Sequence, residues 1–314
     1  MTDFPEAART LRTVRDLIRF GTSRFIEAGL AFGHGSDNAF DESVYLVLHA
    51  LHLPPERLEP FLDARLTDAE IGDALGLIER RVTERKPAAY LTREAWLGDF
   101  HFYVDERVIV PRSFIAELLP DGLAPWITEP DTVQSALDLC TGSGCLAVLL
   151  AHAFPHAAID ASDISPDALD VARRNVMDYR LETRIRLTQS DLFAALAPQR
   201  YDLIIANPPY VDARAMSRLP AEYRHEPRLA LAAGDDGFDV VRRILADAAQ
   251  WLTAAGVLVV EVGHRRAEVE YAFPHLPFFW PETGGGSDCV FMLGADQLAP
   301  GHAPQAAERH QPES

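Results

Sequence analysis

The chain has 314 residues, of which 48% are hydrophobic and 24% charged, a profile typical of a globular protein with more than one domain. No apolar run approaches the roughly 20 residues that span a bilayer. The first residues, MTDFPEAARTLRTVRDL, are too polar for a secretory signal. We therefore expect a cytoplasmic protein whose three cysteines stay reduced and act as small apolar residues.

The chain is strongly acidic, with 47 Asp and Glu against 29 Lys and Arg and a formal charge of −18. A surface of this sign repels the phosphates of nucleic acids unless a local basic patch intervenes, and it attracts basic partners. Solubility by itself would also account for the charge. The negative charge therefore argues against nucleic-acid binding and is compatible with a basic partner.

The N-terminal third has helical patterning. Apolar residues recur at helical spacing over residues 7–30 and 41–52, and Thr67 or Asp68 caps a further helix that stops before Pro87. These patterns predict an all-helical domain over residues 1–95. The alternating stretch FHFYVDERVIV then predicts a β-hairpin linker over residues 96–112, with Asp105 and Glu106 at its turn.

From residue 113 to 296, short apolar strands alternate with helical segments. The predicted strands are SALDLC, AAIDASD, IRLTQSD, YDLIIAN, GVLVVEVG and DCVFMLG. This alternation is typical of an α/β domain with a mostly parallel sheet and helices on both faces. Residues 297–314 lack an apolar period, and we expect a disordered tail there.

In a parallel α/β sheet, ligands bind beyond the carboxyl ends of the strands. The first strand ends in a turn that contains Gly142 and Gly144, the second ends at Asp163, and the third is followed by Asp191. Glycines let the backbone approach a ligand, and Asp163 stands where a ribose diol is held in related folds. Each feature also has a bland interpretation as a tight turn or a loop carboxylate. Taken together, they favour an adenosine-type ligand.

The fourth strand ends in the sequence NPPY. Pro208 and Pro209 carry no backbone N–H and therefore stop the strand. Asn207 then offers a side-chain oxygen, Pro208 a backbone oxygen, and Tyr210 a flat ring. Two fixed acceptors beside a ring suit a planar group that carries an NH2, such as a carboxamide.

An amide nitrogen is a poor nucleophile because its lone pair is delocalised. Accepting both of its N–H groups concentrates electron density on the nitrogen and aims it at an electrophile. S-adenosylmethionine combines adenosine with a reactive one-carbon group and carries the difficult chemistry itself. These residues therefore predict methyl transfer from S-adenosylmethionine to an amide or aryl-amine nitrogen.

Several of these residues resemble a known family. The segments DLCTGSGC at 138–145, Asp163, SDLF at 190–193 and NPPY at 207–210 are similar to those of the HemK-type methyltransferases, which methylate the side-chain amide of glutamine in proteins. The resemblance runs from about residue 40 to 294 and includes RKPAAYLTREAWLGDFHFYVDERVIVPRS. It implies a Rossmann-like class I methyltransferase domain with a seven-stranded sheet.

Two further stretches concern the substrate. VPRSFIAELL at 110–119 and LPAEYRHEPRLALAAGDDGFDVVRRIL after the NPPY motif resemble the PrmB branch of this family, whose substrate is the third protein of the large ribosomal subunit. The branch acting on peptide-release factors typically has P-R-P-D-T-E instead. Phe114 stands where the branch has proline, which puts a loop near the substrate in doubt.

The resemblance also implies site roles. The cofactor contacts would be Asp138, Cys140, Thr141, Gly142, Ser143, Gly144, Asp163, Asp191, Leu192 and Asn207, and the catalytic motif would be Asn207, Pro208, Pro209 and Tyr210. In this assignment, residues 140–144 wrap the methionine and ribose, Asp163 binds the ribose hydroxyls, and Asp191 with Leu192 holds the adenine. Asn207 and Pro208 accept the glutamine N–H groups, while the helical domain recognises the protein substrate.

Three alternatives remain open at this point. The same motif serves methylation of release factors, and it also serves adenine amines in nucleic acids, although that use needs a basic face and an extruded base. A cofactor-binding assembly module without turnover is the third. Pro155 interrupts the helix that carries His152 and His156, so we expect no metal site.

Overall fold

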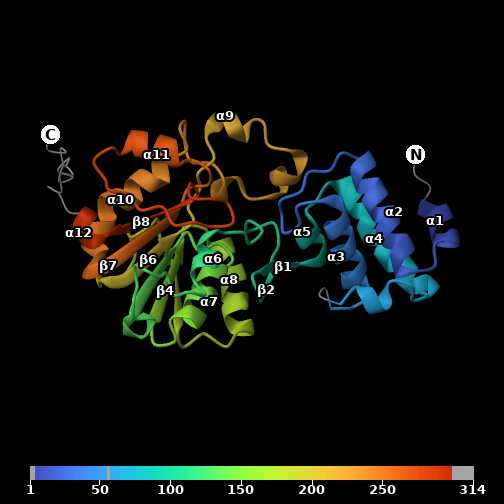
Figure 1. Ribbon diagram of the computed structural model, residues 1–314, viewed down its shortest axis with the longest axis horizontal. Coiled ribbons are helices and arrows are strands. Elements are labelled where there is room, and N and C mark those ends of the chain that lie inside the picture. The colour runs from blue at the N-terminus through green and yellow to red at the C-terminus, as the bar shows by residue number, and fades with distance from the viewer. Residues whose placement is uncertain (1–3, 55–56, 299–314) are drawn as a thin grey trace, which may run out of the picture. The chain divides into compact units, whose positions relative to one another are not determined.

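The computed structural model describes residues 4–54 and 57–298 (Figure 1). These residues form two compact units. The first unit comprises the chain up to Arg112 together with Ala213–Leu231, and the second comprises Ser113–Asp212 and the residues from Ala232 onward. Residues 213–231 therefore belong to the first unit, although the sequence places them inside the predicted α/β domain.

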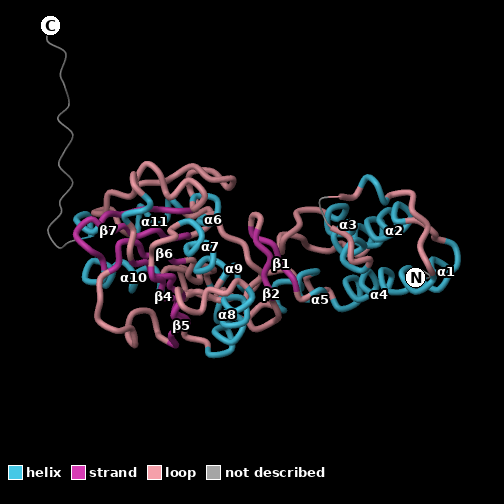
Figure 2. Tube along the Cα trace, turned by 90° about the horizontal axis from the view of Figure 1, so that it is seen from below, coloured by secondary structure: helices cyan, strands magenta, loops and turns pink. Residues whose placement is uncertain are grey.

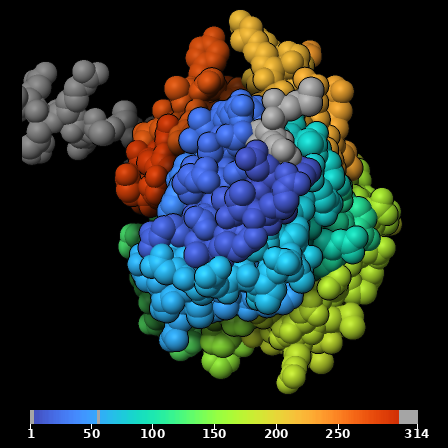
Figure 3. Space-filling view, turned by 90° about the vertical axis from the view of Figure 1, so that its right-hand side faces the viewer, coloured from blue at the N-terminus to red at the C-terminus, as the bar shows by residue number. Residues whose placement is uncertain are grey.

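The first unit is mainly helical, and the space-filling view of Figure 3 draws its N-terminal helices in blue. Its elements are α1 (Phe4–Thr10), α2 (Val14–Glu27), α3 (Ala39–Ala50), η1 (Glu59–Phe61), α4 (Asp68–Glu84), α5 (Ala88–Thr92), β1 (Glu94–Leu97), β2 (Phe100–Tyr103), α9 (Ala213–Met216), η3 (Ala221–His225) and η4 (Arg228–Ala230). The apolar faces of α2, α3 and α4 meet in a core that includes Leu17, Leu46 and Ile78.

The helical pattern over residues 7–30 corresponds to two helices, α1 and α2. The side chain of Thr13 accepts a hydrogen bond from the backbone N–H of Asp16, and the Asp16 carboxylate accepts from the N–H of Thr13. This reciprocal capping box starts a new helix at Val14. The same arrangement at Thr67 and Glu70 confirms the predicted start of α4.

The predicted hairpin exists, but its turn lies elsewhere. Strand β1 pairs antiparallel with β2, and Leu97 lies opposite Phe100, so Gly98 and Asp99 form the turn. Gly98 has a φ of +58°, a conformation that glycine adopts without strain. Asp105 and Glu106 lie beyond the second strand, where the Asp105 carboxylate instead accepts hydrogen bonds from Arg107.

The second unit contains a six-stranded sheet with the order β5-β4-β3-β6-β7-β8, drawn in magenta in Figure 2. Its strands are β3 (Ser135–Leu139), β4 (Ala158–Asp163), β5 (Ile185–Gln189), β6 (Tyr201–Ala206), β7 (Leu252–Glu261) and β8 (Val290–Gly294). All neighbours are parallel except β7 and β8. The mostly parallel α/β sheet confirms the Rossmann-like fold class.

The expected seventh strand is absent among the described residues. Only one residue pair stands in its place, because Phe279 forms an isolated antiparallel bridge with Met292 of β8. Pro277 and Pro281 flank this position. Prolines lack the N–H group that a ladder needs, so the bridge does not extend into a strand.

Helices cover both faces of the sheet (Figure 1). Helix α7 (Cys145–Ala153) and helix α8 (Pro166–Asp178) connect β3, β4 and β5, whereas α10 (Asp239–Trp251) connects β6 to β7. Because the two series of connections run in opposite directions across the sheet, right-handed crossovers place them on opposite faces. The remaining elements are α6 (Ile115–Leu118), η2 (Pro130–Thr132), α11 (Arg266–Ala272) and α12 (Ala295–Leu298).

Residues 297 and 298 of the predicted tail belong to α12, and the rest of that tail lies outside the described residues. Within residues 4–54 and 57–298, every helix falls short of the length and apolarity needed to cross a membrane.

Candidate functional site

The register of the parallel sheet gathers the predicted site residues at one edge. Leu139 of β3 lies opposite Ser162 of β4 on one side and opposite Ala206 of β6 on the other. The residue that follows each of these three belongs to the candidate site: Cys140, Asp163 and Asn207, respectively after Leu139, Ser162 and Ala206. The turn at the end of β3 and the NPPY motif are therefore neighbours at the carboxyl edge.

The turn after β3 is held from inside the protein. The Asp138 side chain is fully buried and accepts a 2.5 Å hydrogen bond from the Thr141 hydroxyl. Burial raises the pKa of Asp138 to about 7. The Asn175 amide of α8 donates to the carbonyl of Ser143 over 2.8 Å. Asp138 and Asn175 thus hold the turn from the interior of the protein. The carboxylate of Asp138 is not exposed at the carboxyl edge of the sheet.

Glycine is required at two positions of this turn for different structural reasons. Both have positive φ, +54° at Gly142 and +78° at Gly144. A Cβ on Gly144 would lie 3.1 Å from the Cβ of Ala172 in α8, so Gly144 lets the turn pack against that helix. A Cβ on Gly142 would meet only the carbonyl oxygen of Cys140, at 4.0 Å. The open side of Gly142 is therefore where a ligand can approach the backbone.

Asp163 closes the other side of the turn. Its carboxylate accepts from the N–H of Gly142 and from the N–H of Ser165, each over 2.9 Å. Burial raises the pKa of Asp163, although these two hydrogen bonds act in the opposite direction. The side chain remains half-buried. Each carboxylate oxygen can accept more than one hydrogen bond, so Asp163 can also receive hydroxyl groups of a ligand.

Asp191 and Leu192 follow β5 at the same edge. The N–H of Ser190 donates to the carbonyl of Asp163 over 2.9 Å, which joins the ends of β4 and β5. Asp191 forms a 2.8 Å ion pair with Arg243 of α10, and both side chains are about half exposed. Leu192 is buried and has a φ of +51°, a rare conformation for a residue with a side chain.

The NPPY motif is fixed by residues that follow β7. The Tyr210 ring lies close to Gly263, where an added Cβ would stand 3.0 Å from the ring. Arg265 donates a 3.1 Å hydrogen bond to the carbonyl of Tyr210, and its guanidinium lies 4.2 Å from the ring centre of Phe238. Pro208 is buried, whereas Asn207, Pro209 and Tyr210 are partly exposed. The motif therefore has a rigid base and an accessible polar surface.

Burial disfavours the thiolate form of both cysteines in the glycine turn. Burial raises the pKa of the Cys140 thiol, and it raises the pKa of the Cys145 thiol to about 12. A raised pKa favours the neutral thiol, which is a poor nucleophile. Cys140 has a φ of +59°, so its backbone conformation continues the tight turn toward Gly142.

Three positioning residues escaped the sequence interpretation: Asn175, Arg265 and Glu261. Glu261 is the last residue of β7 and is buried. The residue before it, Val260, lies opposite Ala206 of β6. Its carboxylate accepts from the Ser113 hydroxyl over 2.6 Å and from the N–H of Phe114 over 2.9 Å. A proline at position 114 could not donate this second bond. The sequence signal is a polar residue on the apolar face of a helix for Asn175 and at a strand end for Glu261.

The segment after the motif connects the site to the first unit. The N–H of Ala233 donates to the carbonyl of Val211 over 3.0 Å, so the two ends of the intervening segment are joined. Between these ends, residues 213–231 pack within the first unit and bring two fully or almost fully buried carboxylates, Glu222 and Glu226.

Both carboxylates are paired with bases of the first unit. Arg112 donates to both oxygens of Glu226, at 2.5 and 2.8 Å, and His34 lies 3.7 Å away. Burial alone would raise the pKa of Glu226, yet Arg112 and His34 lower it to about 2. Arg85 pairs with Glu222 at 2.8 Å. The VPR and HEPR stretches singled out in the sequence therefore meet through Arg112 and Glu226.

Comparison with known proteins identifies relatives of this chain. Residues 122–222 match the family model described as Methyltransferase small domain. The chain is 61% identical over 294 residues to the ribosomal protein uL3 glutamine methyltransferase of Burkholderia pseudomallei, covering 91% of this chain and 96% of that protein. The proteins of the same name from Neisseria gonorrhoeae and Bordetella pertussis are 59% and 60% identical, over 94% and 92% of this chain and 98% and 97% of theirs.

The parallel sheet, the glycine turn at its carboxyl edge and the family match define a methyltransferase of the Rossmann-like class. The near full-length identity to curated relatives is more specific. The chain belongs to the family of ribosomal protein uL3 glutamine methyltransferases.

The contrast between the two glycines is testable by stability measurements. We expect Gly144→Ala to lower the free energy of unfolding by about 2 kcal/mol or more, because the new methyl group meets Ala172 in addition to the strain of positive φ. Gly142→Ala carries only the backbone strain and should cost about 1 kcal/mol. Urea unfolding of both variants measures the difference, and equal losses would show that the packing against α8 is unimportant.

The buried pair in the first unit predicts a stability loss. Glu226→Gln leaves Arg112 without its charged partner and should cost about 3 kcal/mol. The folded pKa of Glu226, about 2, is below its ordinary value of 4.5, so its contribution is complete above pH 4.5 and is lost as the pH falls toward 2. We expect the variant to lose this part of the acid dependence in urea unfolding. Asp63→Asn, which breaks the exposed pair with Arg15, is the control and should behave as wild type.

Proposed function

We propose that this protein transfers a methyl group from S-adenosylmethionine to the side-chain amide nitrogen of a glutamine in ribosomal protein uL3. The observation that carries the proposal is the register of β3, β4 and β6, which sets Asn207 of the NPPY motif beside the glycine turn and Asp163. The substrate is that named for relatives about 60% identical over almost the whole chain. A ribosomal protein as substrate would place the reaction in the cytoplasm.

The residues at the carboxyl edge fit S-adenosylmethionine. The open side of Gly142 admits the methionine part to the backbone of residues 140–144. Asp163 has acceptor capacity for the ribose hydroxyls. Asp191, with Leu192 beside it, would accept from the adenine amine while it keeps its ion pair with Arg243. When bound, the cofactor supplies a methyl group activated by an adjacent positive sulfur.

The NPPY motif fits a glutamine amide. The side-chain oxygen of Asn207 and the carbonyl of Pro208 would each accept one N–H of the amide, which orients the nitrogen and raises its electron density. The Tyr210 ring, held by Gly263 and Arg265, would pack against the amide plane. As the nitrogen gains a carbon it becomes strongly acidic and releases one proton to water. Asn207 is uncharged, so the pocket matches a neutral amide.

The decisive experiment offers labelled S-adenosylmethionine with unmethylated uL3 and with peptide-release factors in parallel. We expect one methyl group on a glutamine of uL3 alone, located by mass spectrometry of the labelled peptide. Asn207→Ala should lower kcat by about 100-fold or more, because it removes an acceptor that orients the reacting nitrogen. Its affinity for S-adenosylmethionine in isothermal titration should fall much less than kcat, because Asn207 is only one of the ten expected cofactor contacts.

The matched variant Asp163→Ala should show the opposite pattern, with weaker cofactor binding as its main defect. Label on release factors instead of uL3 would keep the chemistry and overturn the substrate. Cofactor binding without methyl transfer to any ribosomal protein would leave only a non-catalytic binding module.

Charge predicts which form of the substrate is preferred. Ribosomal proteins are basic and this chain carries −18, whereas an assembled ribosome presents RNA phosphates of the same sign as the enzyme. We expect faster initial methylation of free uL3 than of intact unmethylated subunits, and we expect the difference to shrink as salt screens the charges. Equal initial rates at low salt would exclude this electrostatic preference.

A further inference from the structure

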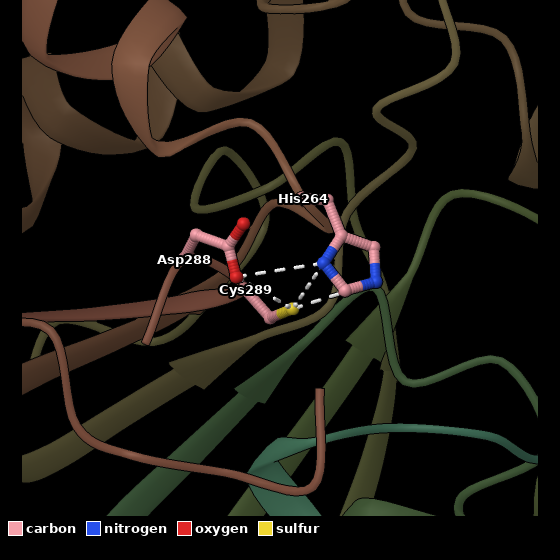
Figure 4. Close-up of side chains that lie close together, drawn as sticks. All are labelled: His264, Asp288 and Cys289. Carbon is pink, nitrogen blue, oxygen red and sulfur yellow. Dashed lines mark hydrogen bonds and ion pairs between the residues drawn. The ribbon is translucent and has the colours of Figure 1, made fainter. Parts of the chain in front are cut away.

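Three side chains with metal-binding chemistry meet at the edge of the second unit (Figure 4). His264 follows β7, while Asp288 and Cys289 immediately precede β8. These strands are antiparallel, and Glu261 lies opposite Val290, so the residue stretches just beyond the paired ends lie side by side. The grouping therefore follows from the sheet and joins His264 to two residues that lie 24 and 25 positions later in the chain.

The distances among the three side chains suit one ion. The Sγ atom of Cys289 lies 3.3 Å from Nδ1 of His264 and 3.8 Å from Oδ1 of Asp288, and that oxygen lies 3.5 Å from Nδ1. Zinc binds sulfur at about 2.3 Å and nitrogen or oxygen at about 2.0–2.2 Å, so tetrahedral geometry separates neighbouring ligand atoms by roughly 3.3–3.7 Å. The observed separations fall in or next to this range.

The cluster combines a fixed interior ligand with two accessible ones. Cys289 is buried, and its carbonyl accepts a 2.8 Å hydrogen bond from the N–H of Val262. A Cβ on Gly285 would lie 2.8 Å from Sγ, so the glycine leaves the space in which the sulfur sits. The side chains of His264 and Asp288 are 64% and 44% exposed, which gives an ion a path from solvent.

We propose that His264, Asp288 and Cys289 bind a divalent metal ion of zinc type, with the fourth coordination position open to water. On binding, the Cys289 thiol releases its proton to solvent and the thiolate, Nδ1 and Oδ1 bind the ion. A carboxylate, an imidazole and a thiolate together select zinc-type ions over magnesium or calcium, which prefer oxygen ligands alone.

The site lies next to the motif that holds the glutamine in the proposed reaction. Gly263, which contacts the Tyr210 ring, precedes His264, and Arg265, which binds the Tyr210 carbonyl, follows it. A bound ion would connect this turn to the start of β8. It would thereby restrict the movement of Gly263 and Arg265, the residues that hold Tyr210. The metal site itself does not depend on the proposed reaction, and its test uses the metal alone.

Titration of the full-length, reduced protein with Co²⁺ tests the proposal. We expect the absorption of a cobalt–thiolate bond in the near ultraviolet, saturating at one ion per chain and removed by Zn²⁺. Cys289→Ser should abolish this absorption. His264→Ala and Asp288→Asn should each weaken Co²⁺ binding by about tenfold or more.

His156→Ala is the matched control, because His156 forms an exposed pair with Asp131 that lacks a cysteine. It should bind Co²⁺ as wild type does. Absence of the thiolate absorption in the wild type, or its persistence in Cys289→Ser, would overturn the proposal. If Cys289→Ser fails to fold, the variants at the exposed His264 and Asp288 decide, and affinities equal to that of His156→Ala would exclude the site.

Discussion

The backbone ladder that aligns β4, β3 and β6 is the constraint on which the site depends. Parallel strands end at one edge, and the pairing of Leu139 with both Ser162 and Ala206 determines which residues come next. A shift of one residue in this register would turn every following side chain to the other face. The apolar strands bury nearly all of their side chains, so the core and the site are specified by the same hydrogen bonds.

A second set of residues forms hydrogen bonds that fix the segments around the strand ends. Asp138 and Asn175 hold the glycine turn, Glu261 holds the Ser113 side chain and the Phe114 backbone, and Arg265 holds Tyr210. Each of these interactions is directed at the backbone or at a neighbouring side chain instead of at the open edge. In the proposed reaction, transfer to a weak amide nucleophile depends on orientation, so groups that fix the proposed acceptors would contribute alongside them.

Buried ion pairs join distant parts of the chain within the first unit. Glu222 and Glu226 come from the segment that follows the NPPY motif, and Arg85 and Arg112 come from the N-terminal part of the chain. Burying these carboxylates is costly unless the bases are correctly placed, so other packings of the segment are disfavoured. The chain leaves the second unit after Asp212 and returns at Ala232, which links the motif covalently to the unit that we assign to substrate recognition.

The sequence by itself determined the types of the elements and the residues at the strand ends. Local signals suffice for these features: apolar period distinguishes strand from helix, Thr67 caps α4, and Pro208 with Pro209 ends β6. The resemblance to a family supplied the reaction, because NPPY and the glycine turn are contiguous in sequence. The roles of the individual site residues remain proposals.

Only the tertiary structure decided which distant residues meet. Local pattern did not show that Gly98 forms the hairpin turn, that the seventh strand is reduced to one bridge at Phe279, or that Glu226 pairs with Arg112, 114 positions away. The grouping of His264 with Asp288 and Cys289 is of the same kind. The physical reason is that a periodic pattern reports which side of an element is buried, whereas the partner of a buried charge or thiol depends on the path of the whole chain.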